Sequence, residues 1–120
     1  MSKEQPVTVS GGDTSLSGIL GIPTKPTGVV LFAHGSGSGR FSPRNRFVAQ
    51  HLQQGGIATL LLDLLVTDEE EDRRNVFDID LLAERVLMAS TWLRENAGTK
   101  HLPLGYFGAS TGAGAALQAA

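Results

Sequence analysis

A serine that could act as a nucleophile lies near the end of the sequence, in the segment Gly108-Ala109-Ser110-Thr111-Gly112. Glycines two positions before and after a serine suit a strand-to-helix turn so tight that larger side chains would collide there. The serine hydroxyl is then exposed at the tip of the turn, and the Thr111 amide can donate a hydrogen bond to an oxyanion. The spacing predicts acyl chemistry with Ser110 as nucleophile. The alternative is a tight turn with only a structural role.

A second glycine-rich segment, His34-Gly35-Ser36-Gly37-Ser38-Gly39-Arg40, follows a predicted strand. An oxyanion needs a second backbone donor, and we expect the Ser36 amide, or alternatively that of Gly37, to supply it. We expect His34 and the glycines to shape the loop, rather than His34 to act as the base. The segment has neither the P-loop nor the dinucleotide spacing. The remaining alternatives are a surface loop and an anion site near Arg40 or Arg44.

Hydrophobic periodicity predicts the elements that position these two segments. Short runs at 7–9 and 16–20, separated by Gly11-Gly12-Asp13, predict an antiparallel hairpin. Continuous apolar runs predict buried parallel strands at 28–33, 57–62 and 104–107. A first helix is predicted at 46–54, where Phe47, Val48 and Leu52 are apolar. A second, long helix ends at Asn96-Ala97-Gly98, and its apolar face consists of Ile79, Leu82, Val86, Ala89 and Leu93. A third helix is predicted just after Ser110. Strands alternating with helices predict an α/β fold with catalytic loops at the carboxyl ends of the strands.

Composition narrows the class of protein. The chain has 120 residues, 41% hydrophobic and 18% charged, with a net charge of -2, which fits one modest globular domain and disfavours nucleic-acid binding. There is no cysteine, so disulfides, thiolate metal sites and a cysteine nucleophile are excluded. No signal peptide or membrane-spanning run is evident, and we expect a cytoplasmic location without membrane association.

Other polar residues have simpler interpretations. Asp63 ends a predicted strand, and we expect it to form a turn or cap a helix, with a catalytic acid as the alternative. His51 and His101 are expected at the surface. The charged run 68–74 is expected to be solvated, since metal ligands must converge. We expect no metal and no cofactor.

The motif segments together resemble the α/β-hydrolase superfamily, and within it the dienelactone-hydrolase-like branch. The resemblance is carried by 29–37, by Leu60-Leu61-Leu62-Asp63 and by 105–112. It implies a mostly parallel, eight-stranded sheet, and a triad in the order nucleophile, acid, histidine. Dienelactone hydrolases proper use a cysteine nucleophile, whereas this chain has Ser110, which favours a general esterase-like activity.

The resemblance also implies that the acid and the histidine follow the nucleophile by many residues, so no residue of this sequence is assigned to either role. Residues 1–120 are therefore expected to form the N-terminal portion of one hydrolase domain, truncated after the helix that follows Ser110. We predict a serine hydrolase acting on carboxylic esters or related acyl compounds, with acyl transfer using the same residues. The alternative is a non-catalytic domain or an inactive fragment. The substrate's identity and the oligomeric state stay open.

Overall fold

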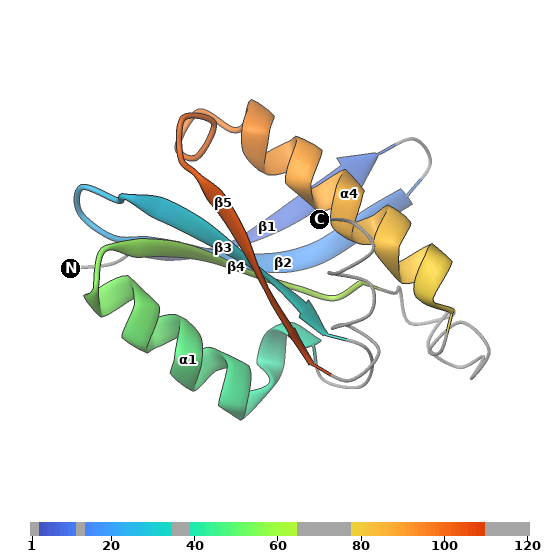
Figure 1. The fold of residues 1–120 in the computed structure, drawn as a ribbon, viewed down its shortest axis with the longest axis horizontal. Coiled ribbons are helices and arrows are strands. Elements are labelled where there is room, and N and C mark those ends of the chain that lie inside the picture. The colour runs from blue at the N-terminus through green and yellow to red at the C-terminus, as the bar shows by residue number, and fades with distance from the viewer. Residues whose placement is uncertain (1–2, 12–13, 35–38, 65–77, 110–120) are drawn as a thin grey trace.

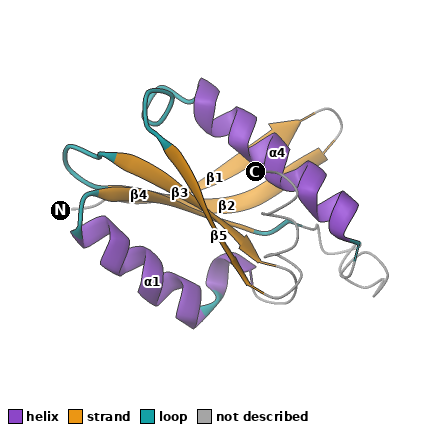
Figure 2. Cartoon of the chain, in the orientation of Figure 1, coloured by secondary structure: helices purple, strands orange, loops and turns teal. Residues whose placement is uncertain are grey.

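The computed structural model describes residues 3–11, 14–34, 39–64 and 78–109. Its strands and helices are shown in Figures 1 and 2. The strands are β1 Lys3–Gly11, β2 Thr14–Ile22, β3 Gly28–His34, β4 Ile57–Leu62 and β5 Leu104–Ala109. The helices are the 3-10 turn η1 Gly39–Phe41 and the α-helices α1 Pro43–Gln54 and α4 Ile79–Glu95. The predicted strands and both predicted helices within the described residues are confirmed.

The strands form one sheet in the order β1-β2-β4-β3-β5. The β1–β2 and β2–β4 pairs are antiparallel, which confirms the N-terminal hairpin, and β4, β3 and β5 run parallel. The carboxyl ends of these three parallel strands point to the same side of the molecule, the lower right in Figure 1. The α/β architecture predicted from the sequence is confirmed, and both candidate loops follow strands that end on this side.

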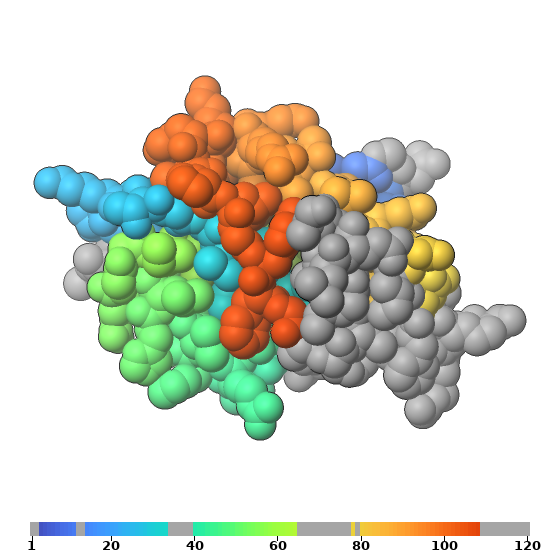
Figure 3. Space-filling view, viewed as in Figure 1, coloured from blue at the N-terminus to red at the C-terminus, as the bar shows by residue number. Residues whose placement is uncertain are grey.

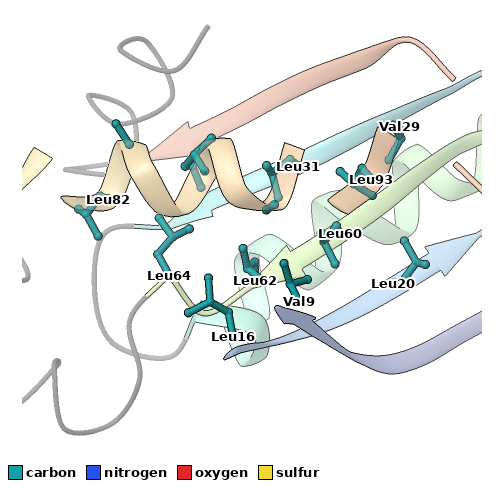
Figure 4. Packing of buried hydrophobic residues seen from close by; sticks show 14 of the residues in the cluster. Val9, Leu16, Leu20, Val29, Leu31, Leu60, Leu62, Leu64, Leu82 and Leu93 are labelled. Carbon is teal, nitrogen blue, oxygen red and sulfur yellow. The ribbon is translucent and has the colours of Figure 1, made fainter. Parts of the chain in front are cut away.

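The two α-helices cover opposite faces of the sheet (Figure 1). Side chains alternate along a strand, so Leu31 packs in the cluster beneath α4, while the next residue, Phe32, packs with Ala49 of α1. Figure 4 shows the larger cluster, in which leucines and valines of the sheet meet Leu82 and Leu93 of α4. Burial on both faces explains why β3 and β4 are continuous apolar runs rather than alternating ones.

Helix α1 begins three residues before the predicted start at 46. Ser42 caps it by accepting a hydrogen bond from the Asn45 amide at 3.3 Å, and Pro43 occupies a first-turn position that needs no donor. The expected apolar face was partly wrong, since the Phe47 side chain is 61% exposed. Buried Ala49, together with Val48 and Leu52, faces the sheet instead.

Helix α4 follows its predicted pattern closely. Asp78 caps it, with its Oδ1 accepting the Leu81 amide at 3.0 Å. Of the five predicted apolar positions, Leu82, Val86, Ala89 and Leu93 are buried, and the side chain of Ile79 lies outside the described residues. Neither α1 nor α4 has the length and apolar content needed to cross a bilayer. The charged run 68–74 and the helix predicted after Ser110 lie outside the described residues.

Candidate active site

The strands that precede the two candidate loops, β3 and β5, end side by side. These strands are parallel and hydrogen-bonded, and their last register pairs are Ala33 with Gly108 and His34 with Ala109. Neighbouring strands lie about 4.8 Å apart. Because Gly35 follows His34 directly and Ser110 follows Ala109 directly, both loops begin from adjacent points on the sheet.

The predicted reactive residues themselves lie outside the described residues. They are Gly35, Ser36, Gly37, Ser110, Thr111 and Gly112. Their roles as nucleophile, oxyanion donors and loop-shaping glycines stay predictions. Of the other predicted site residues, His34 is the last residue of β3 and half-buried Gly108 the next-to-last of β5. Both therefore stand at the sheet edge where the sequence predicted the site.

Strand β5, which ends just before Ser110 in the sequence, packs against neighbours on both faces. On the α1 side, the rings of Phe107 and Phe32 pack with their centroids 5.0 Å apart. On the α4 side, the Tyr106 hydroxyl shares a 2.9 Å hydrogen bond with the Ser90 hydroxyl. In Figure 3, β5 crosses the surface between α1 and α4, and its residues from Leu104 to Gly108 are only half-buried.

An ion pair that sequence reasoning missed lies beside the first loop. The Asp63 carboxylate, just after β4, accepts the Arg40 backbone N–H at Oδ1 over 2.6 Å and pairs with the Arg40 guanidinium at Oδ2. The sequence analysis expected Asp63 to form a turn or cap a helix and named no partner for it, and the structure adds Arg40 as its partner. The sequence held no direct signal for this pairing, because the pairing depends on β3 and β4 lying side by side in the sheet.

A buried cation, Arg85, contacts the chain just after β4, at Leu64. Arg85 of α4 is 9% exposed and donates from Nη1 to the Leu64 carbonyl at 3.1 Å. The backbone N–H of Asp63 donates to the Ser17 carbonyl of β2 at 3.0 Å. The chain leaving β4 is thus tied to both α4 and β2.

Other polar side chains of the described chain have no evident place in the site. His51 and His101 are exposed, as predicted, and His51 packs edge-on against Phe47 with centroids 4.5 Å apart. The described residues contain no cluster of three or more side chains suited to hold a metal. A cavity of about 360 Å³ lined by Lys3, Gln5, Ile22, Pro23 and Thr24 lies where β2 ends beside the start of β4, the end of the sheet opposite to the candidate loops.

Comparison with solved structures identifies the fold. A dienelactone hydrolase from Anabaena variabilis is 58% identical, with a TM-score of 0.94 over 99% of this chain and 57% of that one. The chain belongs to the α/β-hydrolase superfamily. Within the superfamily it resembles the dienelactone-hydrolase-like branch, and it spans little more than half the length of that hydrolase. The esterase Est1E from Butyrivibrio proteoclasticus shares the fold at 16% identity, with a TM-score of 0.75 over 95% of this chain and 44% of that one.

Curated relatives of this α/β-hydrolase chain carry a different name. Two Mycobacterium tuberculosis proteins, each named "Putative phosphoribosyl transferase", are 55% identical over 118 residues, 98% of this chain. The chain spans only 27% of their length, so about three quarters of each relative has no counterpart in it. No protein-family model matches the chain.

Proposed function

We propose that this chain supplies the nucleophile and the oxyanion hole of a serine hydrolase that acts on carboxylic esters or related acyl compounds. The observation that supports it most is the register of β3 and β5. The proposed donors, Ser36 and Thr111, each lie two residues beyond the matched pair formed by His34 and Ala109. Two amides at the same sequence separation from paired strand ends would be suited to bind one oxygen atom between them.

The proposed reaction follows from these roles. The Ser110 hydroxyl attacks the ester carbonyl while a histidine takes its proton, and the amides of Thr111 and Ser36 stabilise the oxyanion. The intermediate collapses to an acyl-serine as the protonated histidine gives its proton to the leaving alcohol, and water activated by the same histidine then releases the acid. The histidine and the acid that orients it belong, on this proposal, to a part of the complete protein that follows residue 120.

The name of the mycobacterial relatives raises phosphoribosyl transfer as a second activity. A bound pyrophosphate would call for free amides and a free cation beside a glycine-rich loop. Arg40 is the cation next to the segment 35–38, and its guanidinium is paired with Asp63. Because the chain matches only 27% of those relatives, we assign hydrolysis to this segment and leave the named activity to the rest of their length.

The test uses the complete protein, a panel of nitrophenyl esters of increasing acyl length and a fluorophosphonate probe. We expect ester turnover and stoichiometric labelling at Ser110, mapped by mass spectrometry. Ser110→Ala should lower kcat at least about 1000-fold, because nucleophile and base act as a unit. Ser10→Ala, an exposed serine on the hairpin, is the matched control and should behave as wild type. Undiminished turnover in Ser110→Ala would refute the proposal.

A further inference from the structure

Helix α1 presents an aromatic and cationic stripe to solvent. Phe47 is 61% exposed, and exposed Arg44 and His51 lie one turn before it and one turn after it. The rings of His51 and Phe47 already pack edge-on against each other. Residues three and four apart share one face of a helix, so the three side chains form a continuous surface. We call Arg44, Phe47 and His51 the α1 stripe.

The positive charge around the α1 stripe is not balanced locally. The sequence has no acidic residue between Asp13 and Asp63. Arg44 and Arg46 lie in the first turn of α1, where the helix dipole disfavours cations. Within the described part of the chain, neither of these arginines forms an ion pair. An acidic surface placed on the α1 stripe would therefore be electrostatically favoured.

Helix α4 presents a stripe of the opposite charge on the other face of the sheet. Leu87 is 48% exposed, and exposed Glu84 and Thr91 lie one turn before it and one turn after it. We call Glu84, Leu87 and Thr91 the α4 stripe. Exposed Arg94 and Glu95 follow it, and their charges offset each other. The α4 stripe thus combines an apolar side chain with a negative one.

The two stripes match position by position when the helices run parallel. In each stripe the charged residue precedes the apolar one by three positions, and the third residue follows by four. Parallel alignment sets Arg44 against Glu84 and Phe47 against Leu87. Antiparallel alignment about the same apolar contact would set Arg44 against Thr91. Only the parallel arrangement therefore joins the opposite charges while it buries the two exposed apolar side chains together.

The fold allows successive copies of the chain to make this parallel contact. Helix α1 connects the parallel strands β3 and β4, and α4 leads into β5, which is parallel to both. Both helices begin on the side to which the carboxyl ends of these strands point, and they lie on opposite faces of the sheet (Figure 1). We propose that a second copy of this chain docks its α4 stripe on the α1 stripe. The contact joins two different surfaces, so further copies can add in the same orientation.

Other occupants of the α1 stripe make different predictions. A two-fold pairing of α1 stripes would bring Arg44 and Arg46 of two copies together, and like charges repel. An acidic partner of another sequence would need the α1 stripe but not Glu84. A single helix pair makes a small interface, so the association of copies is weak, reversible and reduced by salt.

Charge reversal tests the proposed contact in the complete protein. Arg44→Glu and Glu84→Arg should each weaken self-association at least about 10-fold, because each sets like charges against each other. An equimolar mixture of the two variants should associate again, since the reversed charge on α1 of one meets the reversed charge on α4 of the other. The double variant should also associate, because both of its stripes are reversed. Phe47→Ser should weaken association without changing charge.

Sedimentation velocity over a concentration series, at low and at high salt, measures the association. Lys100→Glu, at an exposed position outside both stripes, is the matched charge-reversal control and should behave as wild type. Melting temperatures verify that each variant folds. Restored association in the mixture and in the double variant supports the proposal. A wild-type protein that stays monomeric throughout, association that survives either single reversal, or a mixture that stays dissociated overturns it.

Discussion

His34 and Ala109 are register partners at the carboxyl ends of two parallel strands, β3 and β5. Each is the last residue of its strand, and each is followed at once by a segment that the sequence marks as reactive. The pairing is between residues 75 positions apart, by the difference of their numbers, so it is produced by the fold and not by proximity in the chain. The two segments that are proposed to form the oxyanion hole therefore both follow strands that end side by side.

Gly108 pairs with Ala33 in the last part of this register, two residues before Ser110. We expect Gly108→Val to lower kcat at least about 10-fold, because a branched side chain there would collide with the tight turn and displace the nucleophile. Ester turnover and fluorophosphonate labelling of the complete protein check this.

The matched control is Gly105→Ala in the same strand. A Cβ at Gly105 would meet its nearest neighbour, Val30 Cγ2, at 3.9 Å, an ordinary contact. This variant should retain wild-type turnover. If both variants were fully active, Gly108 would have no role in shaping the turn.

Phe32 lies two residues before the end of β3, with 1% of its surface exposed, and its ring packs on Phe107 of β5. Phe32→Ala should lower the free energy of unfolding by about 3–5 kcal/mol, because it leaves a cavity between the sheet and α1. Chemical denaturation of the complete protein measures the change. Leu87→Ala, at a position that is 48% exposed, should change it by less than about 0.5 kcal/mol. Equal effects of the two substitutions would contradict the packing described for this face.

Much of this framework could be predicted from the sequence, for identifiable reasons. The runs 28–33 and 57–62 are continuous and apolar because both faces of those strands are buried, and helix α4 keeps a clear apolar stripe. The start of α1 was predicted three residues too late. The apolar pattern begins only at Phe47, whereas the helix itself begins at Pro43 and is capped by Ser42.

Contacts between residues far apart in the chain could not be predicted from the sequence. The Arg40–Asp63 pair joins residues 23 apart and depends on β4 lying next to β3, an order that hydrophobic patterns do not specify. The exposure of Phe47 likewise depends on how α1 rotates on the sheet to bury Ala49. Sequence predicted the carboxyl ends of the strands to within two residues, and the structure supplied which of those ends are neighbours.

Gly21 in β2 faces a buried amide and should not tolerate a side chain. A Cβ there would lie 2.2 Å from Gln53 Nε2, which donates to Thr59 Oγ1 at 2.7 Å. Gly21→Ala must move Gln53 and break this buried hydrogen bond, so we expect a loss of about 1–3 kcal/mol in unfolding free energy. Gly28→Ala is the control, since its nearest neighbour would be the Pro103 carbonyl oxygen at 3.5 Å. Equal stability of both variants in urea denaturation would show that Gln53 is not fixed as described.

Asp78 is the N-cap of α4, and replacing it tests how much the cap contributes to the stability of the helix. Its Oδ1 accepts the Leu81 N–H at 3.0 Å, which satisfies one of the amides that the first turn leaves free. Asp78→Ala should therefore cost about 1 kcal/mol of unfolding free energy, whereas Asp78→Asn keeps an acceptor and should cost a few tenths. Since α4 carries Ser90, which bonds Tyr106 of β5, hydrogen exchange should rise at the first turn of α4 but not at β5. A loss of protection in β5 as well would mean that the cap stabilises the whole α4–β5 unit rather than the helix end alone.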